Sequence, residues 1–293
     1  MVSAPVERDT TFVSFFQGLD GLRDDPAVTI VDVGAQELKE ESHVYSALTT
    51  CWPHRVIGFE PVYEKELVER TAFGERRVLP YALGDGAEHA LNVTRYSALS
   101  SVYTPNDLQR SEFHGPKHFH EIVKTVPLQT RALDTLGLDQ ADFIKLDTQG
   151  AEPLIVKGGA RYFSRTPLVY SETFFVPMYE GLPLFDEHLS LFRTLGFELF
   201  DLYLNGRRRA ELQIDDPYPA LAPNGGRLVW ADALYGQRHL TTGEPSAIQR
   251  GKALKAALLL HFVFRHYDVA ARILERYAGE SHARDYAAMI KAA

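Results

Sequence analysis

Five acidic side chains recur at the ends of short apolar runs in the first 175 residues of the chain. They are Asp32, Glu60, Asp85, Asp147 and Glu172. Each run is typical of a buried strand, and the carboxyl ends of parallel strands meet at one edge of a sheet, where ligands bind. Any one of these acids could instead cap a helix. Their regular recurrence nevertheless predicts a single acidic crevice.

Residues 142–152, DFIKLDTQGAE, carry the acid with the clearest chemical role. The apolar run leads directly to Asp147 and then turns at Gly150. A carboxylate held in a cleft can remove a proton, and clustering with other acids favours proton uptake near neutrality. We therefore expect Asp147 to be the catalytic base or the residue that orients it, with Glu172 as a second catalytic acid. The same pair could alternatively hold a divalent cation. A metal requirement is left open, and no metal ligand is assigned.

The pattern after the first strand indicates the kind of ligand. Glu60 follows Asp32 by 28 residues, where a carboxylate could take the paired hydroxyls of a ribose. The fingerprint G-x-G-x-x-G is absent, so no loop is shaped for a pyrophosphate. An adenosyl ligand without phosphate, S-adenosylmethionine, fits better, because an acidic cleft complements its sulfonium and ammonium groups.

The elements that would position these residues alternate between β-rich runs and helical patterns, which is typical of βαβ units and a parallel sheet. Strands are expected at 28–35, 55–61, 76–85, 142–147 and 167–175, and helices at 37–51, 62–72, 151–163 and 183–196. Two more strands, 197–205 and 226–236, would form an antiparallel edge. Residues 86–125 form an insertion, which we expect to act as a lid or substrate loop.

The composition limits the class of protein and its partners. The chain has 293 residues, of which 45% are hydrophobic and 24% charged, as in an ordinary globular protein. A net charge of −8 disfavours a nucleic-acid partner, because phosphate binding needs a basic face. The single cysteine, Cys51, excludes an internal disulfide and suits a reducing compartment. Without a secretory signal or an apolar run long enough to span a bilayer, we expect a cytoplasmic protein with no membrane span.

Seven short motifs occur in order over about residues 28–236: VDVGA, GFEP, YALG, SS, TRALDTL, FIKLDTQGAE and VYSE. Together they resemble the FkbM family of S-adenosylmethionine-dependent methyltransferases. The resemblance implies a Rossmann-like class I methyltransferase fold. It also implies methyl transfer to hydroxyl oxygens, often on sugars or secondary metabolites, with S-adenosylhomocysteine as the product.

The resemblance also assigns eight residues to the cofactor. Asp32, Gly34 and Ala35 would line its methionine part, and Glu60, followed by Pro61, would hold its ribose. Ala82, Leu83 and Gly84 would flank its adenine. The first motif departs from the family pattern D-V-G-A-N-x-G, since Gln36 replaces Asn and Leu38 replaces the second Gly. Either the loop takes another path, or the cofactor is shifted, or the site no longer binds a cofactor.

Five residues are candidates for contacts with a small-molecule or carbohydrate acceptor: Ser100, Ser101, His120, Gln149 and Phe175. The serines match a family motif, although turn residues would look the same. His120 is either a base on a substrate loop or part of a solvated loop. Gln149 replaces the carboxylate of the family's D-x-E-G pattern. Phe175 would wall the acceptor pocket or pack in the core.

The chain thus divides into a lead-in, 1–26, a methyltransferase domain, 27–240, and a C-terminal helical extension, 241–293. The extension either packs as a cap on the edge of the sheet or joins two copies in a homo-oligomer. Two other functions remain open. A nicotinamide-dependent dehydrogenase lacks its phosphate-binding glycines here, whereas the altered loop at Gln36 and Leu38 is compatible with a non-catalytic binding protein.

Overall fold

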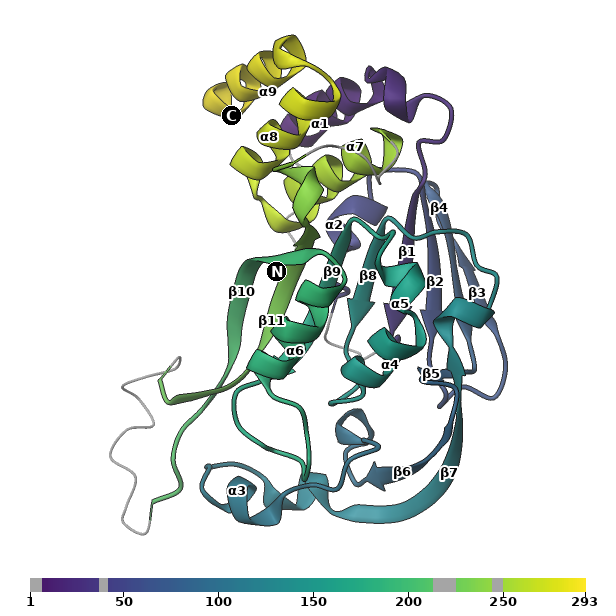
Figure 1. Cartoon of the computed structure of the whole chain (residues 1–293), viewed down its shortest axis with the longest axis vertical. Coiled ribbons are helices and arrows are strands. Elements are labelled where there is room, and N and C mark those ends of the chain that lie inside the picture. The colour runs from purple at the N-terminus through teal and green to yellow at the C-terminus, as the bar shows by residue number, and fades with distance from the viewer. Residues whose placement is uncertain (1–6, 37–41, 213–224, 244–249) are drawn as a thin grey trace.

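The structure is a computed structural model that describes residues 7–36, 42–212, 225–243 and 250–293. Its largest element is an eight-stranded mixed sheet, which confirms the expected α/β class (Figure 1). In order across the sheet the strands are β10 (Phe197–Arg208), β11 (Arg227–Gln237), β9 (Leu168–Phe174), β8 (Phe143–Leu146), β1 (Val28–Val33), β2 (His54–Phe59), β4 (Gly74–Leu79) and β3 (Leu67–Arg70).

The strand order reverses beside β1. The strands from β9 to β4 are parallel, and the chain passes from β1 to β2 on one side but returns through β8 on the other. Such a reversal opens a crevice at the carboxyl ends of the strands. β11 is antiparallel to both β9 and β10, so the two strands expected to form an antiparallel pair do so.

One face of the sheet is covered by helices that follow its strands along the chain. They are α4 (Glu152–Gly158), α5 (Ala160–Phe163) and α6 (Phe185–Thr194). Pro153 lies in the first turn of α4, where backbone N–H groups have no partner within the helix, so a residue without an N–H is tolerated. Because side chains alternate along a strand, Val31 and Ile144 point into this layer while their neighbours point to the other.

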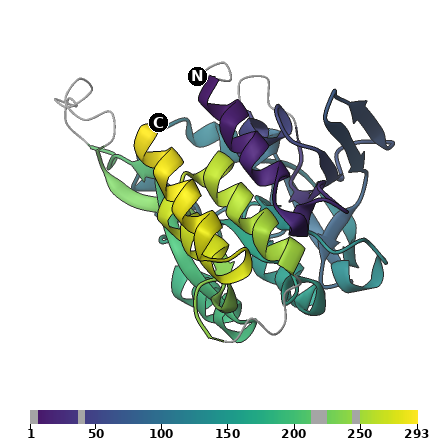
Figure 2. The same cartoon turned by 90° about the horizontal axis from the view of Figure 1, so that it is seen from above.

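The opposite face is covered by helices from the two ends of the chain, which Figure 2 shows side by side. They are α1 (Glu7–Gln17), α7 (Arg250–Leu259), the π-helical turn η6 (Leu260–Phe264), α8 (Tyr267–Tyr277) and α9 (Glu280–Ala292). Phe264 lies 5.6 Å from Phe143 of β8, measured between ring centroids. Between β1 and β2 the described residues form only the short helix α2 (Ser46–Thr49). The terminal helices therefore supply the apolar cover that a largely parallel sheet needs on both faces.

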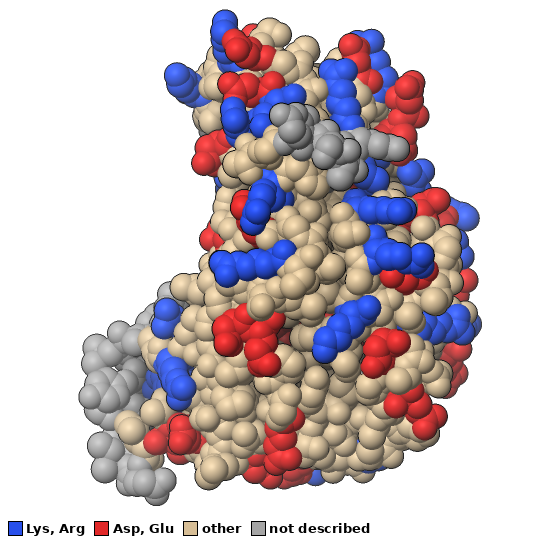
Figure 3. All heavy atoms as spheres, viewed as in Figure 1, with Lys and Arg blue, Asp and Glu red and all other residues tan. Residues whose placement is uncertain are grey.

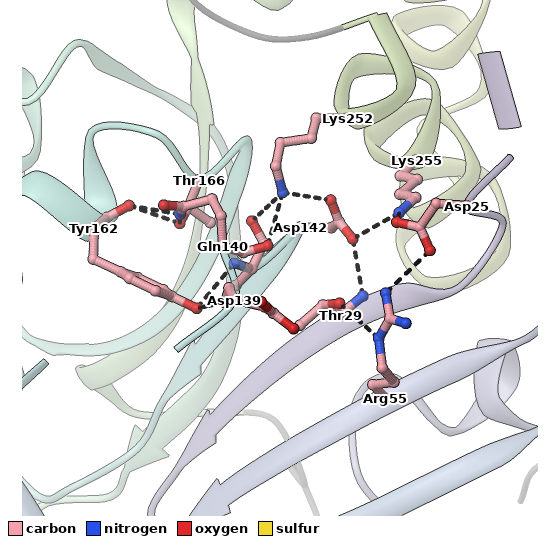
Figure 4. A network of polar contacts seen from close by, with 11 residues as sticks. Asp25, Thr29, Arg55, Asp139, Gln140, Asp142, Tyr162, Thr166, Lys252 and Lys255 are labelled. Atoms are coloured by element: carbon pink, nitrogen blue, oxygen red, sulfur yellow. Dashed lines mark hydrogen bonds and ion pairs between the residues drawn. The ribbon is translucent and has the colours of Figure 1, made fainter. Parts of the chain in front are cut away.

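A buried polar network ties these terminal helices to the amino ends of the strands (Figure 4). Asp142, only 1% exposed, precedes β8 and accepts a hydrogen bond from the backbone N–H of Thr29 at 2.9 Å. Lys252 of α7 lies 2.9 Å from the other carboxylate oxygen of Asp142. Lys255, one turn further, bridges Asp142 at 3.5 Å and Asp25 at 2.8 Å. The carboxylate of Asp142 thus joins two strands to the C-terminal helices.

Replacing Asp142 by Asn should destabilise the protein, because two lysines of α7 would lose their buried counter-charge. We expect the free energy of unfolding to fall by roughly 2–3 kcal/mol. Urea denaturation followed by circular dichroism measures it. The control is Glu280→Gln, which removes an exposed pair with Arg284 and should cost less than about 0.5 kcal/mol. Equal losses in both variants would contradict a structural role for this network.

The helix expected at 62–72 is wrong, since this segment contains β3, which pairs antiparallel with β4. Charged side chains face each other across the pair. Glu69 lies 3.1 Å from Arg76, and Arg70 lies 3.0 Å from Glu75. Opposite charges across a strand pair stabilise the sheet. Within the segment itself, Lys65 with Glu69 and Glu66 with Arg70 are four residues apart, which is the spacing of oppositely charged neighbours on a helix.

The single strand expected at 76–85 is also wrong. Pro80, which has no N–H to donate, ends β4 and separates it from β5. β5 belongs to a second sheet with the order β5 (Ala82–Gly84), β7 (Ile122–Ala132) and β6 (Glu88–Thr94). The 86–125 insertion therefore contains β6 and the start of β7, with α3 (Asp107–Ser111) between them.

Short 3-10 turns complete the described elements: η1 (Asp20–Leu22), η2 (Ser97–Leu99), η3 (Lys117–His120), η4 (Leu133–Thr135) and η5 (Arg238–Leu240). On the face shown in Figure 3, acidic and basic side chains are intermixed, and neither sign forms a continuous patch. Among the described residues, no helix combines the length and apolar character needed to cross a membrane.

Candidate active site

A cavity of about 680 Å³ lies at the carboxyl ends of β1, β2 and β8. Residues of β6 and β7 form its opposite wall, so the second sheet covers the crevice of the first. Of the eight residues assigned to a cofactor, six line this first cavity: Gly34, Glu60, Pro61, Ala82, Leu83 and Gly84. The cavity thus brings together segments that lie fifty residues apart in the sequence.

Glu60 follows β2 and is almost fully buried in the wall of the first cavity. Its backbone N–H donates to the carbonyl of Leu79, 3.0 Å away, and its Oε1 accepts from the N–H of Val62 at 3.1 Å. Burial raises the pKa of Glu60. The side chain is therefore a rigidly held acceptor in a poorly solvated place, suited to hydroxyl groups.

Asp32 is fully buried beneath the cavity and does not line it. One carboxylate oxygen accepts a 2.7 Å hydrogen bond from the hydroxyl of Tyr45, and the other lies 3.4 Å from the ammonium of Lys145. Asp32 therefore acts on the cavity through Lys145, which lines it, whereas Tyr45 does not. Ala35 is buried as well, with its methyl group packed against Gly58.

Lys145 is a residue of the cavity wall that sequence reasoning missed. Its ammonium lies 3.4 Å from Asp147 and donates to the carbonyl of Gly34 at 3.1 Å. Burial alone would lower the pKa of Lys145, but Asp32 and Asp147 raise it above its ordinary value, so the side chain stays cationic. The pairing of β1 with β8 puts Lys145 directly beside Asp32. Aligning the runs IVDV and FIKL would have revealed it.

Asp147 ends β8 at the cavity, with its side chain 45% exposed. Its backbone N–H bonds to the carbonyl of Val33 at 3.0 Å, which fixes where β8 leaves the sheet. Gly34 has φ +78°, and a Cβ there would lie 1.8 Å from the carbonyl oxygen of Asp147. A glycine is therefore required for the two strand ends to approach so closely.

Gln149 lines both the first cavity and a second one of about 360 Å³. Its amide Nε2 donates to Glu172 at 2.9 Å, and its Oε1 accepts from the hydroxyl of Tyr179 at 2.9 Å. Its carbonyl accepts a 2.6 Å bond from the hydroxyl of Ser101. The backbone has φ +55°, which is uncommon for a residue with a side chain. These bonds hold the amide as a partition between two cavities.

Glu172 and His120 line the second cavity. Burial first, and the nearby Asp147 and Glu152 second, raise the pKa of Glu172 well above its ordinary value. Burial, with the charges of Arg110 and Arg208, lowers the pKa of His120 to about 4. A carboxyl group that takes up protons readily and a neutral imidazole thus share this wall.

The remaining predicted acceptor contacts lie in different places. Ser100 and Ser101 line the first cavity, and the Ser100 hydroxyl accepts from the N–H of Thr94 at 3.2 Å. Phe175 lines neither cavity, since its ring stacks on Phe185 at 5.0 Å, whereas its neighbour Phe174 lines the second. Neighbouring residues of a strand point to opposite faces, so a shift of one residue separates the two rings.

The expected single crevice of five acids is corrected at three positions, because Asp32 lies beneath the first cavity, Glu172 lines the second and Asp85 lines neither. Asp85 directly follows β5, and its carboxylate lies 2.8 Å from a ring nitrogen of His89 instead of facing either cavity. Asp232 of β11, which the sequence did not single out, lines the first cavity instead. It pairs with Glu172 across the antiparallel edge, and burial raises its pKa.

Two other predictions concern the loop after β1 and a metal ion. Gln36 lines the first cavity and its amide donates to the hydroxyl of Ser97 at 3.4 Å, while Leu38 lies outside the described residues. Within the part of the chain that the structure describes, no three His, Cys, Asp or Glu side chains gather in a way that could hold a metal ion.

Comparison with known proteins identifies the family. The family described as Methyltransferase FkbM domain matches residues 32–199, which is more than half of the chain. The chain belongs to the FkbM methyltransferase family. None of the curated proteins and none of the solved structures compared with the chain matches it. The FkbM match spans β1 to the start of β10, so it includes Glu60, Asp147 and Gln149 but ends before Asp232 and the terminal helices.

The stability of this FkbM protein should depend on pH through Glu152. Burial raises the pKa of Glu152 to about 7, although the N–H and hydroxyl of Thr148 donate to its Oε1 at 2.6 and 3.0 Å. The folded state therefore keeps a proton that the unfolded chain releases above its ordinary pKa of 4.5. Stability contributed by this group is present below pH 4.5 and is lost as the pH rises to about 7.

Replacing Glu152 by Gln keeps an oxygen for Thr148 but removes the titration. The decline of the thermal midpoint between pH 5 and pH 8 should be smaller in this variant than in the wild type. Differential scanning fluorimetry across that range measures it, with the exposed Glu180→Gln as the control. An unchanged decline in Glu152→Gln would show that another group is responsible.

Proposed function

We propose that this chain transfers a methyl group from S-adenosylmethionine to a hydroxyl of a sugar or small natural product. The observation that carries the proposal is the pair of cavities joined at Gln149. One holds Glu60 and Asp147, and the other holds Glu172. A donor and an acceptor that react directly need two adjoining sites whose contents meet at one point. Gln149 marks such a point.

The residues of the first cavity fit an adenosyl donor. Its volume of about 680 Å³ is in the range of cofactor sites. Glu60 is suited to the ribose hydroxyls. The backbone of Ala82–Gly84, together with the side chains of Tyr81 and Leu83, offers an apolar slot for a flat base. Asp147 and Asp232 contribute negative charge that complements a sulfonium. Such a donor supplies an electrophilic methyl group when bound.

The strand order supports the finer description of the fold. A reversal of order between β1 and β8, with an antiparallel β11 beside β9, agrees with a Rossmann-like class I methyltransferase fold. The cavity at that reversal agrees with it as well.

Two carboxylates are candidates for accepting the hydroxyl proton of the acceptor. Asp147 is partly exposed at the mouth of the first cavity, 3.4 Å from the ammonium of Lys145. Glu172 lies in the second cavity, where its raised pKa favours proton uptake and Gln149 fixes its orientation. We assign the role of base to Asp147 and that of the second acid to Glu172. The aromatic wall at Phe174 and Tyr179 would exclude water from the reacting groups.

Binding of the spent cofactor tests the proposal directly. Isothermal titration calorimetry should give a micromolar or tighter dissociation constant for S-adenosylhomocysteine. Glu60→Gln should weaken that binding by about tenfold, because a carboxylate accepts stronger hydrogen bonds than an amide. Glu64→Gln, exposed in the same loop, should not. Binding of NAD in place of S-adenosylhomocysteine would favour a dehydrogenase, and binding of neither would favour a non-catalytic protein.

The role of Asp147 is tested by Asp147→Asn. With a labelled methyl donor and a panel of sugars and natural products, the wild type identifies an acceptor, and the variant should then lose at least about 100-fold in kcat. Its affinity for S-adenosylhomocysteine should stay within a few-fold. Asp85→Asn, another acid at a strand end but outside both cavities, is the matched control. Full turnover by Asp147→Asn would remove Asp147 from the mechanism.

A further inference from the structure

The second cavity differs in charge from the first. Its wall contains three cationic residues, Arg110, Lys117 and Arg208, and a single acid, Glu172. Asp107 pairs with Arg110 and Glu211 with Lys117, so of the three only Arg208 lacks an ion pair among the described residues. This is the reverse of the acidic first cavity, and it contrasts with a chain whose net charge is −8. Burial and the nearby acids raise the pKa of Glu172 well above its ordinary value.

Arg208, at the end of β10, is the cation best placed for a ligand. Its guanidinium carbon lies 4.2 Å from the ring centre of Trp230, which also lines the second cavity. Gly206 permits this arrangement, since a Cβ there would lie 2.2 Å from the Trp230 ring. Among the described residues, no carboxylate pairs with Arg208, whose one hydrogen bond goes to the carbonyl of Arg207 at 3.3 Å. An arginine stacked in this way presents its remaining N–H groups as a planar fork.

Arg110 lines the same cavity and is only 8% exposed. It donates to Asp107 at 2.6 Å and to the carbonyl of Lys117 at 2.8 Å. Its Nε is buried and has no partner among the described residues. A buried guanidinium N–H without an acceptor is costly, so this donor is unusual unless a ligand completes it.

The pKa of His120 is affected by the positive charges of the same wall. Its Nδ1 is buried and, within the described part of the chain, unpartnered. After burial, the charges of Arg110 and Arg208 are the main causes that lower the pKa of His120 to about 4. Both guanidinium groups therefore act on one small volume, and an anion entering it would meet a positive potential.

The geometry points to an acceptor that carries an anionic group, a carboxylate or a phosphate, on a sugar ring. Arg208 would take the anion as a forked ion pair, with Arg110 adding positive charge from the same wall. The ring would pack against the aromatic wall, which includes Tyr96, Phe119 and Trp230. The hydroxyl to be methylated would then face Gln149 and Glu172 at the junction with the first cavity. This assignment of the acceptor class rests on the proposed function, but its binding test needs no turnover.

The test uses matched sugars that differ in the anionic group. Methyl β-D-glucuronide and methyl β-D-glucoside share a ring and differ by a carboxylate, while glucose 6-phosphate and glucose differ by a phosphate. The chain has two tryptophans, and Trp52 is fully buried in the core, so fluorescence of Trp230 reports on the second cavity. Titration in the presence of S-adenosylhomocysteine should show at least about tenfold tighter binding of one anionic sugar than of its neutral partner. The better anionic probe distinguishes a uronic acid from a sugar phosphate.

Arg208→Met should reduce this preference to within about twofold, because it removes the charge but keeps an apolar contact with Trp230. Arg207→Met, the neighbouring residue on the same strand, does not line the cavity and should retain the preference. Calorimetry with S-adenosylhomocysteine is run on all three proteins, so that failure of the first cavity is seen separately. Equal binding of neutral and anionic sugars by the wild type, no binding of either anionic sugar at millimolar concentrations, or an undiminished preference in Arg208→Met would overturn the assignment.

Discussion

The ion cluster of Lys145 with Asp32 and Asp147 is the interaction on which the rest of the site depends. Asp32 is fully buried, and a buried carboxylate needs a partner because its desolvation is costly. Lys145 supplies that partner from the neighbouring strand and at the same time contacts Asp147 and the carbonyl of Gly34. One ammonium group thereby joins the end of β1 to the end of β8. The position of both strand ends, and hence of the crevice, follows from it.

Much of the site could be predicted from the sequence because strand ends are visible in an apolar pattern. Glu60, Asp147 and the glycine of the first motif were found in this way, and the first cavity includes all three. Lys145 and Asp232 were missed because each lies within a strand. Their importance comes from the residue beside them in the sheet, Asp32 and Glu172 respectively. Pairing between strands is a long-range property that a single pass along the chain does not contain.

The fold was predictable in class but less so in its local elements. Lys65 with Glu69 and Glu66 with Arg70 are four residues apart, which fits a helix, whereas the pairing of β3 depends on β4, further along the chain. The proline at position 80 was a visible signal of the break between β4 and β5. The segment 241–293 was recognised as helical. The terminal helices cover the sheet face on which only the short α2 follows β1. This position depends on the packing of the whole domain and cannot be read from the sequence of these helices alone.

The position of Gln149 between the two cavities has a consequence for how the binding of two ligands is coupled. Its backbone is held in a left-handed conformation by Ser101 on one side, and its side chain by Tyr179 and Glu172 on the other. A ligand that shifts this residue from either cavity changes the shape of both. The affinities of the two ligands are then thermodynamically linked, and each must alter the affinity for the other by the same factor. Cooperativity between two small molecules can thus arise from a single shared amide, without any movement of domains.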